Sequence, residues 1–155
     1  HVYCDVEMVR TGINKPALAL RGSEVHCLIK DEKVAELAKE LGVTRSIAAM
    51  RTFGKQLDGQ IVAIGNAPTA LYEVLRLALE EGVKPALIIG IPVGFVGAAE
   101  SKDYLMEVSP VPYITAKCNT GGSPIAASVV NALLYTGVKR DGMLFVQDNE
   151  SKKND

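Results

Sequence analysis

Four short segments combine glycine with polar residues in the manner of ligand-binding loops. They are residues 44–46, 65–69, 90–102 and 121–124. Each follows a predicted strand or opens a predicted helix, and open α/β sheets bind ligands outside the carboxyl ends of their strands. The first turn of a helix also offers unpaired backbone N–H groups and the positive end of the helix dipole. We therefore expect the segments to converge on one edge that binds an anionic ligand.

Simpler structural roles remain open for each segment. Residues 65–69 also fit a capped turn, Arg45 fits an ordinary surface position, and Lys102 fits the first solvated turn of a helix. Ser123 is first of all a helix N-cap, because a nucleophilic serine needs a base within hydrogen-bond reach. The glycines of residues 90–102 form neither a dinucleotide fingerprint nor a P-loop, which argues against a nucleotide ligand.

The histidines and cysteines do not have the spacing of a metal site. His26 lies in an apolar run, so we expect a structural histidine rather than a proton donor, and His1 has no evident role. The chain has an odd number of cysteines, and they form no CxxC pair: Cys4, Cys27 and Cys118. This pattern argues against a disulfide framework and a structural zinc site, and it favours a reducing cytoplasm.

Composition excludes some classes of partner. The 17 basic and 18 acidic residues nearly cancel, so no overall positive field draws the chain to nucleic acid or to an anionic membrane. No stretch approaches the roughly 20 apolar residues of a membrane span, and the first residues show no basic flank followed by the apolar core of a signal sequence. The chain begins at His1, inside a strand-like run and without an initiator methionine. We expect it to be N-terminally incomplete.

Alternating strands and helices are expected to position the loops. Residues 61–64 and 86–89 are short apolar runs followed by glycine, the pattern of strands that are buried on both faces of a parallel sheet. Between them, apolar residues recur at helical spacing from a start at Pro68 to a stop at Gly82. Other expected strands are residues 1–6, 25–29 and 113–116, and other expected helices run from Asp31 to Gly42, from Thr44 to Met50 and from Ser123 to Gly137.

This alternation predicts an α/β fold with three layers, in which a mostly parallel central sheet carries helices on both faces. We expect residues 1–148 to form a single α/β domain, because 155 residues of which 48% are hydrophobic can bury one ordinary core. Residues 149–155 are polar and charged, and we expect them to form a frayed tail.

Several motifs, in order, give the chain a specific resemblance. They are Asp5-Val6-Glu7-Met8-Val9 with Gly12-Ile13, Thr44-Arg45-Ser46, residues 65–71, residues 92–102, and Gly121-Gly122-Ser123 with Asn131-Ala132-Leu133. In this order they resemble the precorrin-8X methylmutase family of cobalamin biosynthesis, from about Val2 to Leu134. The resemblance implies an isomerase that moves a methyl group from C-11 to C-12 of precorrin-8X or cobalt-precorrin-8, giving hydrogenobyrinate or cobyrinate.

The resemblance also implies a homodimer with sites near the subunit interface and no organic cofactor. The substrate is a broad tetrapyrrole fringed with carboxylates, which needs apolar surface and scattered anion donors. Glycine-rich helix starts with Arg45 and Lys102 suit such a ligand. The expected substrate-binding residues are Thr44, Arg45, Ser46, Asn66, Thr69, Gly94, Gly97, Ser101, Lys102, Lys117, Gly121, Gly122 and Ser123.

Two departures from the family pattern bear on activity. The resemblance implies a catalytic histidine that protonates the macrocycle and lies upstream of His1, so no catalytic residue is assigned within the chain. Where the family has an arginine and a glycine before Gly-Gly-Ser, this chain has Lys117-Cys118-Asn119-Thr120. Two alternatives to a methylmutase stay open, namely a relative that binds a tetrapyrrole without isomerising it and a folded remnant that serves as a dimeric scaffold.

Overall fold

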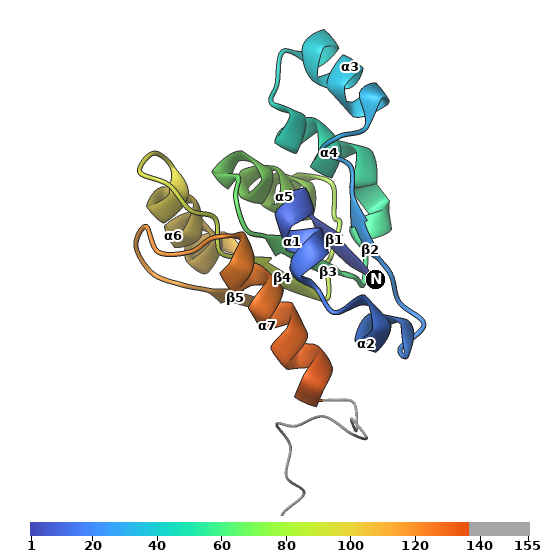
Figure 1. The fold of residues 1–155 in the computed structure, drawn as a ribbon. Helices are drawn as coiled ribbons and strands as arrows, with labels where there is room; N and C mark the ends of the chain where they lie inside the picture. Colours follow the sequence, from blue (N-terminus) through green and yellow to red (C-terminus); the bar gives the residue numbers. More distant parts are fainter. Residues whose placement is uncertain (137–155) are drawn as a thin grey trace, which may run out of the picture.

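Five parallel strands form the central sheet of the computed structural model, which describes residues 1–136 (Figure 1). The order of the strands in the sheet is β2-β1-β3-β4-β5, and every neighbouring pair is parallel. The chain therefore moves outward from β1 to β2, returns past β1 to β3, and continues in the opposite direction. The strands are β1 (Val2–Cys4), β2 (Val25–Cys27), β3 (Ile61–Ile64), β4 (Leu87–Gly90) and β5 (Tyr113–Thr115).

Helices connect the strands and cover both faces of the sheet. They are α1 (Glu7–Gly12), α2 (Lys15–Ala19), α3 (Glu32–Leu41), α4 (Arg45–Phe53) with the 3₁₀ turn η1 (Gly54–Leu57), α5 (Pro68–Glu80), α6 (Ala98–Val108) and α7 (Ser123–Thr136). One core joins α4, α5 and α6 to the sheet through residues such as Met50, Leu71 and Leu105. The other joins α1, α2 and α7 to the opposite face through Val9 and Val130, among others.

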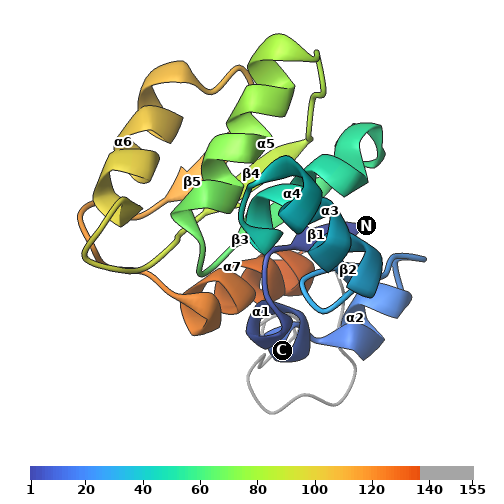
Figure 2. The ribbon, with the colours of Figure 1, turned by 90° about the horizontal axis from the view of Figure 1, so that it is seen from above.

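This arrangement confirms the predicted three-layer α/β fold, and Figure 2 shows the two groups of helices on either side of the sheet. Helix α3 lies outside these layers and packs on α4 through a small cluster that includes Val34 and Ala48. None of the helices within residues 1–136 combines the length and the apolar character that a membrane crossing requires.

Local capping signals in the sequence are confirmed. The Asp31 side chain accepts hydrogen bonds from the backbone N–H groups of Lys33 and Val34 at 2.9 and 3.2 Å, and Gly42 ends α3 with φ 65°. Thr44 caps α4 by accepting from the N–H of Ile47 at 3.2 Å. These side-chain bonds satisfy donors that the first turn of a helix leaves unpaired, so the helix limits follow from local chemistry.

Several predicted limits were wrong, and two helices were missed. The strands at 1–6, 25–29 and 113–116 are shorter, ending at Cys4, Cys27 and Thr115, because the backbone leaves the sheet there to enter the loops. Helix α4 runs on to Phe53, whose side chain is buried in the core. Helices α1 and α2 were not predicted, since each is shorter than two turns. The predicted helix end at Gly137 and the tail at 149–155 lie outside the described residues.

Candidate ligand-binding site

The carboxyl ends of all five strands lie along one edge of the sheet because the strands are parallel. The segments that begin at Asp5, Gly65, Ile91 and Ala116 follow β1, β3, β4 and β5, respectively. This edge is where the predicted binding loops start. The contacts between these loops decide whether they form one site.

The Asp5 carboxylate binds the turn that follows β3. Asp5 is fully buried, and its side chain accepts hydrogen bonds from the backbone N–H groups of Gly65, Asn66 and Ala67 at 2.9, 2.9 and 2.8 Å. Burial raises the pKa of Asp5, and the three N–H donors act in the opposite direction. A carboxylate of the chain thus occupies these N–H groups, which agrees with the capped-turn role that the sequence left open for residues 65–69.

The position of this contact follows from the topology. In a doubly wound sheet of order 2-1-3-4-5, the usual ligand crevice lies between the carboxyl ends of β1 and β3. Asp5 follows β1, and its bonds to the β3 turn close that crevice from within. Sequence reasoning missed this role, although an aspartate directly after an apolar strand was a usable signal. The predicted ligand contacts are therefore left to groups further out on the loops.

The turn after β3 lies directly against the start of α7. A Cβ atom added at Gly65 would lie 2.7 Å from the Cα of Ser123 and 2.6 Å from Cγ2 of Val9. Only glycine allows the two backbones to approach this closely. Residues 65–69 and 121–124 are therefore in contact, as the sequence predicts.

The loop after β4 contacts the same glycines. The N–H of Gly122 donates to the carbonyl oxygen of Ile91 at 3.0 Å, and a Cβ at Gly121 would lie 2.6 Å from the carbonyl oxygens of Ile91 and Pro92. A Cβ at Gly97 would lie 3.5 Å from the ring of Pro68. These distances join residues 91–97 to both neighbouring segments.

Residues 44–46 reach the edge through a pair of threonines. The hydroxyl of Thr44 donates to the hydroxyl of Thr69 at 3.4 Å. Arg45 and Asn66 have exposed side chains beside this contact, and Ser46 is half-buried. All four predicted segments thus meet at one edge, with polar groups of Arg45, Asn66 and Thr69 available on its surface.

The loop between β4 and α6 presents apolar side chains to solvent. Phe95 is 95% exposed and Val96 is 91% exposed. Adjacent apolar side chains that are this exposed can mark a surface that binds a ligand or a partner. Gly94 and Gly97 flank them with φ values of 141° and 84°, which favour glycine. Glycine fixes the shape of this loop, while Phe95 and Val96 offer a surface that the predicted site residues did not include.

Lys102 and Ser101 face the interior rather than solvent. Both side chains are fully buried; the ammonium of Lys102 donates to the carbonyl oxygen of Thr120 at 2.6 Å, and the Ser101 hydroxyl donates to that of Ala98 at 2.9 Å. Burial lowers the pKa of Lys102. In this structure Lys102 therefore holds the loop before Gly121, and its direct contact with a ligand stays a prediction. Lys117, in the same loop, is exposed.

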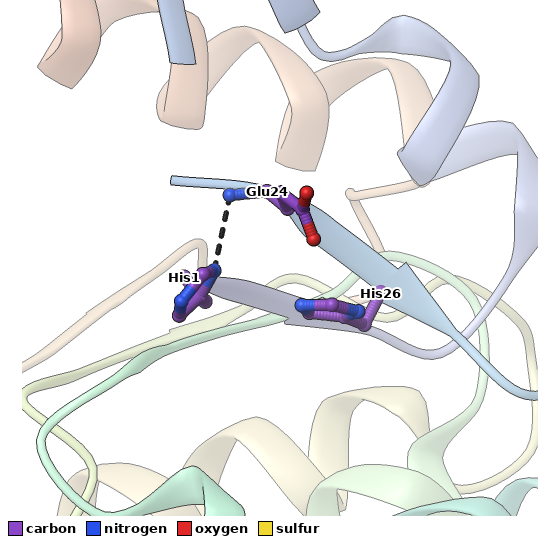
Figure 3. A group of neighbouring side chains, drawn as sticks. All are labelled: His1, Glu24 and His26. Carbon is purple, nitrogen blue, oxygen red and sulfur yellow. Dashed lines mark hydrogen bonds between the residues drawn. The ribbon is translucent and has the colours of Figure 1, made fainter. Parts of the chain in front are cut away.

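Within residues 1–136, one group of side chains has donor atoms close enough to suggest a metal site. The group consists of His1, Glu24 and His26, and one potential metal-ligand atom of each residue lies within 4.8 Å of those of the other two (Figure 3). The backbone N–H of Glu24 donates to Nδ1 of His1 at 3.1 Å, which occupies one of the ring's two nitrogens. His26 stacks on Tyr3 at 4.9 Å between ring centroids, in agreement with a structural role. His1 and Glu24 precede β1 and β2, so the group lies away from the loop edge.

The fold and the converging loops define a class of protein, an α/β protein whose glycine-rich loops meet at the carboxyl edge of a parallel sheet. The family model described as precorrin-8X methylmutase matches residues 1–136. The chain belongs to this family.

Individual relatives agree with this assignment. The chain is 46% identical over 133 residues to a cobalt-precorrin-8 methylmutase of Methanocaldococcus jannaschii, covering 86% of this chain and 60% of the relative. It is 48% identical over 144 residues to the cobalt-precorrin-8 methylmutase of Priestia megaterium, covering 91% and 64%. The chain therefore spans only about three fifths of the length of these curated relatives.

Solved structures match the fold. A structure described as a precorrin-8X methylmutase related protein superposes with a TM-score of 0.80 at 41% identity, covering 87% of this chain and 70% of that one. The precorrin-8X methylmutase of Thermus thermophilus superposes with a TM-score of 0.75 at 38% identity, covering 86% and 65%. The α/β architecture is thus that of solved family members.

Proposed function

We propose that this chain supplies the substrate-holding part of an isomerase of cobalamin biosynthesis. The reaction moves a methyl group from C-11 to C-12 of precorrin-8X or cobalt-precorrin-8 and gives hydrogenobyrinate or cobyrinate. The observation that carries the proposal is the contact of four family motifs at one edge of the sheet. The printed names of the curated relatives support the same reaction.

The chemistry of the edge suits a tetrapyrrole. The macrocycle is broad and apolar, and Phe95 and Val96 offer exposed apolar surface next to a glycine-rich loop. The carboxylates around the ring require scattered donors, and Arg45, Asn66 and Lys117 are exposed on three different segments. Asp5 occupies the N–H groups of the β3 turn, so these side chains take over the contacts with anions.

Proton donation is the step for which these residues offer no group. The resemblance implies a histidine upstream of the residue 5–9 motif. His1 precedes β1 and His26 is stacked on Tyr3 within the sheet, so neither lies among the converging loops. The second candidate function is a tetrapyrrole-binding relative that does not isomerise its ligand.

We also propose the assembly and setting in which the site works. Residues 1–148 form a single domain, and the working unit is a cytoplasmic homodimer with its sites near the subunit interface. The family resemblance supports the homodimer, and the near balance of 17 basic and 18 acidic residues fits a protein that binds neither nucleic acid nor membranes. Sedimentation velocity tests the dimer, and a monomer at micromolar concentration would contradict it.

The visible spectrum of precorrin-8X tests the proposed reaction, because the methyl shift rearranges the conjugated ring. Two forms are compared, the 155-residue chain and the chain extended by its encoded upstream segment, if one is present. The isomerase proposal predicts conversion by the extended form. Binding without conversion by both forms would favour the non-catalytic relative, and an unperturbed spectrum with both would refute tetrapyrrole recognition.

A further inference from the structure

Two cysteines are paired across the neighbouring strands β1 and β2. Cys4 and Cys27 are direct partners in the parallel register, and both pack on the core on the α1 and α7 side of the sheet. Neighbouring strands lie about 4.8 Å apart, which falls within the roughly 4.4–6.8 Å between the Cα atoms of a disulfide. Both cysteines are free thiols in this structure. A bond between them needs side-chain rotation and little movement of the backbone.

The two thiols differ in access. Cys4 is fully buried, and its Sγ donates to the carbonyl oxygen of His26 at 3.4 Å. Cys27 lies at the end of the edge strand β2 and is half-buried. It lines a surface pocket of about 440 Å³ together with Glu7 and Arg10. A small reagent can therefore reach Cys27 from this pocket, while Cys4 lies beneath it.

The two thiols also differ in acidity. The interaction between the two thiols lowers the pKa of Cys27 and raises that of Cys4. The thiolate is the attacking form in thiol–disulfide exchange, and a thiol of lowered pKa is more often in that form. Access and acidity thus point to the same residue as the attacking group.

We propose that Cys27 and Cys4 form a redox-reactive dithiol that exchanges with small-molecule disulfides such as glutathione disulfide. The Cys27 thiolate attacks one sulfur of glutathione disulfide, the S–S bond breaks, and one glutathione thiolate leaves and takes up a proton. Cys4 then loses its proton and attacks the Cys27 sulfur, which expels the second glutathione. Two protein thiols are oxidised, one glutathione disulfide is reduced to two thiols, and the chain gains a Cys4–Cys27 disulfide.

The location links this chemistry to the candidate site. Cys4 immediately precedes Asp5, whose carboxylate holds the turn at residues 65–67. A bond at Cys4 constrains the backbone that carries this carboxylate. The exposed Cys118 lies in the loop at residues 117–120 and is a separate thiol, so it serves as the reference for ordinary surface reactivity.

Mass spectrometry of the folded protein tests the proposal. A Cys118→Ser protein is incubated with glutathione disulfide, its remaining thiols are alkylated after denaturation, and its peptides are mapped. We expect a product lighter by two hydrogens, with no alkylated thiol and a Cys4–Cys27 crosslinked peptide, and we expect reduction to restore both thiols. A protein that keeps both thiols alkylatable, or that accumulates stable glutathionylated Cys27, would overturn the proposal.

Two single variants in the same background separate the roles of the cysteines. With Cys4→Ser, the reaction should stop at the mixed disulfide of Cys27. With Cys27→Ser, Cys4 should stay unmodified in the folded protein, because its side chain is buried. Modification of Cys4 at the rate of the exposed Cys118 in the unsubstituted protein would contradict the assignment of Cys27 as the attacking thiol. The crosslink in the Cys118→Ser protein itself decides the proposal if either variant fails to fold.

Discussion

Asp5 has a structural role, because its side chain binds three backbone N–H groups. Its buried carboxylate satisfies the N–H groups of Gly65, Asn66 and Ala67, which otherwise have no acceptor in the turn. Burying a carboxylate is unfavourable unless it is hydrogen-bonded, and each of these bonds offsets part of that cost. The hydrogen bonds of Asp5 therefore offset the cost of burying its carboxylate and hold the turn at residues 65–67 in place.

We expect Asp5→Ala to lower the free energy of unfolding by about 3 kcal/mol or more, since each buried donor left without a partner costs about 1–3 kcal/mol. Urea unfolding measures the loss. Asp31→Ala is the matched control, because Asp31 also accepts two backbone N–H bonds but caps an exposed helix start. Its loss should be about 1 kcal/mol. Equal losses for the two variants would contradict the role of Asp5.

Arg45 offers a cationic group on the candidate site. Arg45→Ala should weaken the binding of hydrogenobyrinate by about 10- to 100-fold, through loss of a charge-assisted hydrogen bond of about 1.5–3 kcal/mol. A titration followed by absorbance gives the Kd. Arg21→Ala removes the same charge from an exposed residue on the segment that leads to the amino end of β2 and should leave the Kd unchanged. Unchanged affinity in Arg45→Ala would remove Arg45 from the site.

At the scale of elements, glycine sets how closely the β3 turn and α7 approach. Gly65→Ala should cost about 3 kcal/mol, because its Cβ would meet the Cα of Ser123 at 2.7 Å and the backbone cannot rotate away. Gly82→Ala is the control, since its φ of 69° is strained for alanine but no atom lies within 4 Å. Its cost should be about 1 kcal/mol.

Unfolding and binding measurements together test this account of Gly65. The Gly65→Ala variant should also bind hydrogenobyrinate more weakly, because the displaced start of α7 belongs to the proposed site. The Gly82→Ala variant should bind normally. A Gly65→Ala protein with unchanged stability would show that the two backbones are not in contact.

Glu73 links helices α4 and α5 through two arginines. Its buried carboxylate accepts from Arg51 at 2.9 Å and from Arg76 at 2.7 Å. Burial acts to raise the pKa of Glu73, but the two guanidinium groups outweigh it and hold the pKa below its ordinary value. A lowered pKa in the folded state means that the carboxylate stabilises the fold above the unfolded pKa. That stabilisation is lost as the pH falls through the folded pKa.

We expect Glu73→Gln to cost about 1–2 kcal/mol at neutral pH, a value reduced because the arginines are partly exposed. The difference from the unsubstituted protein should shrink as the pH falls below about 4, the range in which glutamate protonates. Urea unfolding across this range measures it. Glu80→Gln is the control, because Glu80 meets the same Arg76 at 3.3 Å but is 66% exposed, and it should show little effect. A constant cost for Glu73→Gln at all pH values would contradict the linkage.

The elements that the sequence predicted were those with local signals. Asp31, Thr44 and Gly42 mark helix limits by contacts within a few residues, and the apolar runs of β3 and β4 are continuous. Helix α1 lacks a side-chain cap, and α2 has one in Asn14, which accepts from the N–H of Ala17, but both helices are short and pack on α7.

The candidate site was predictable in its location and not in its contacts. Parallel strands bring loops to one edge whatever their detail, so the convergence of the three segments after β3, β4 and β5 followed from the order of elements. Residues 44–46 join α3 to α4 and reach the edge only through the contact of Thr44 with Thr69. The bond from Asp5 to Gly65 spans 60 positions, and that from Lys102 to Thr120 spans 18. Such pairings depend on the strand order and on the path of the loops, which periodicity does not contain.

At the scale of the whole molecule, the carboxyl edge of the sheet differs from the rest of the surface. The carboxyl edge carries the glycine-rich loops, the exposed Phe95 and the polar groups of Arg45 and Asn66. Elsewhere, a pocket of about 250 Å³ is lined by Val2, Ile61, Leu18 and Val130, among others. The central claim of a tetrapyrrole site predicts that the ligand protects the carboxyl edge and leaves this pocket unchanged.

Amide hydrogen exchange with and without hydrogenobyrinate tests that claim most directly. Exchange at residues 44–46, 93–97 and 117–123 should slow by up to about 100-fold when the ligand is at about 100 times its Kd. The N–H groups of residues 65–67 should exchange slowly in both states, because Asp5 already binds them. Protection centred on Val2 and Val130, or no protection at all, would contradict a tetrapyrrole site at the carboxyl edge.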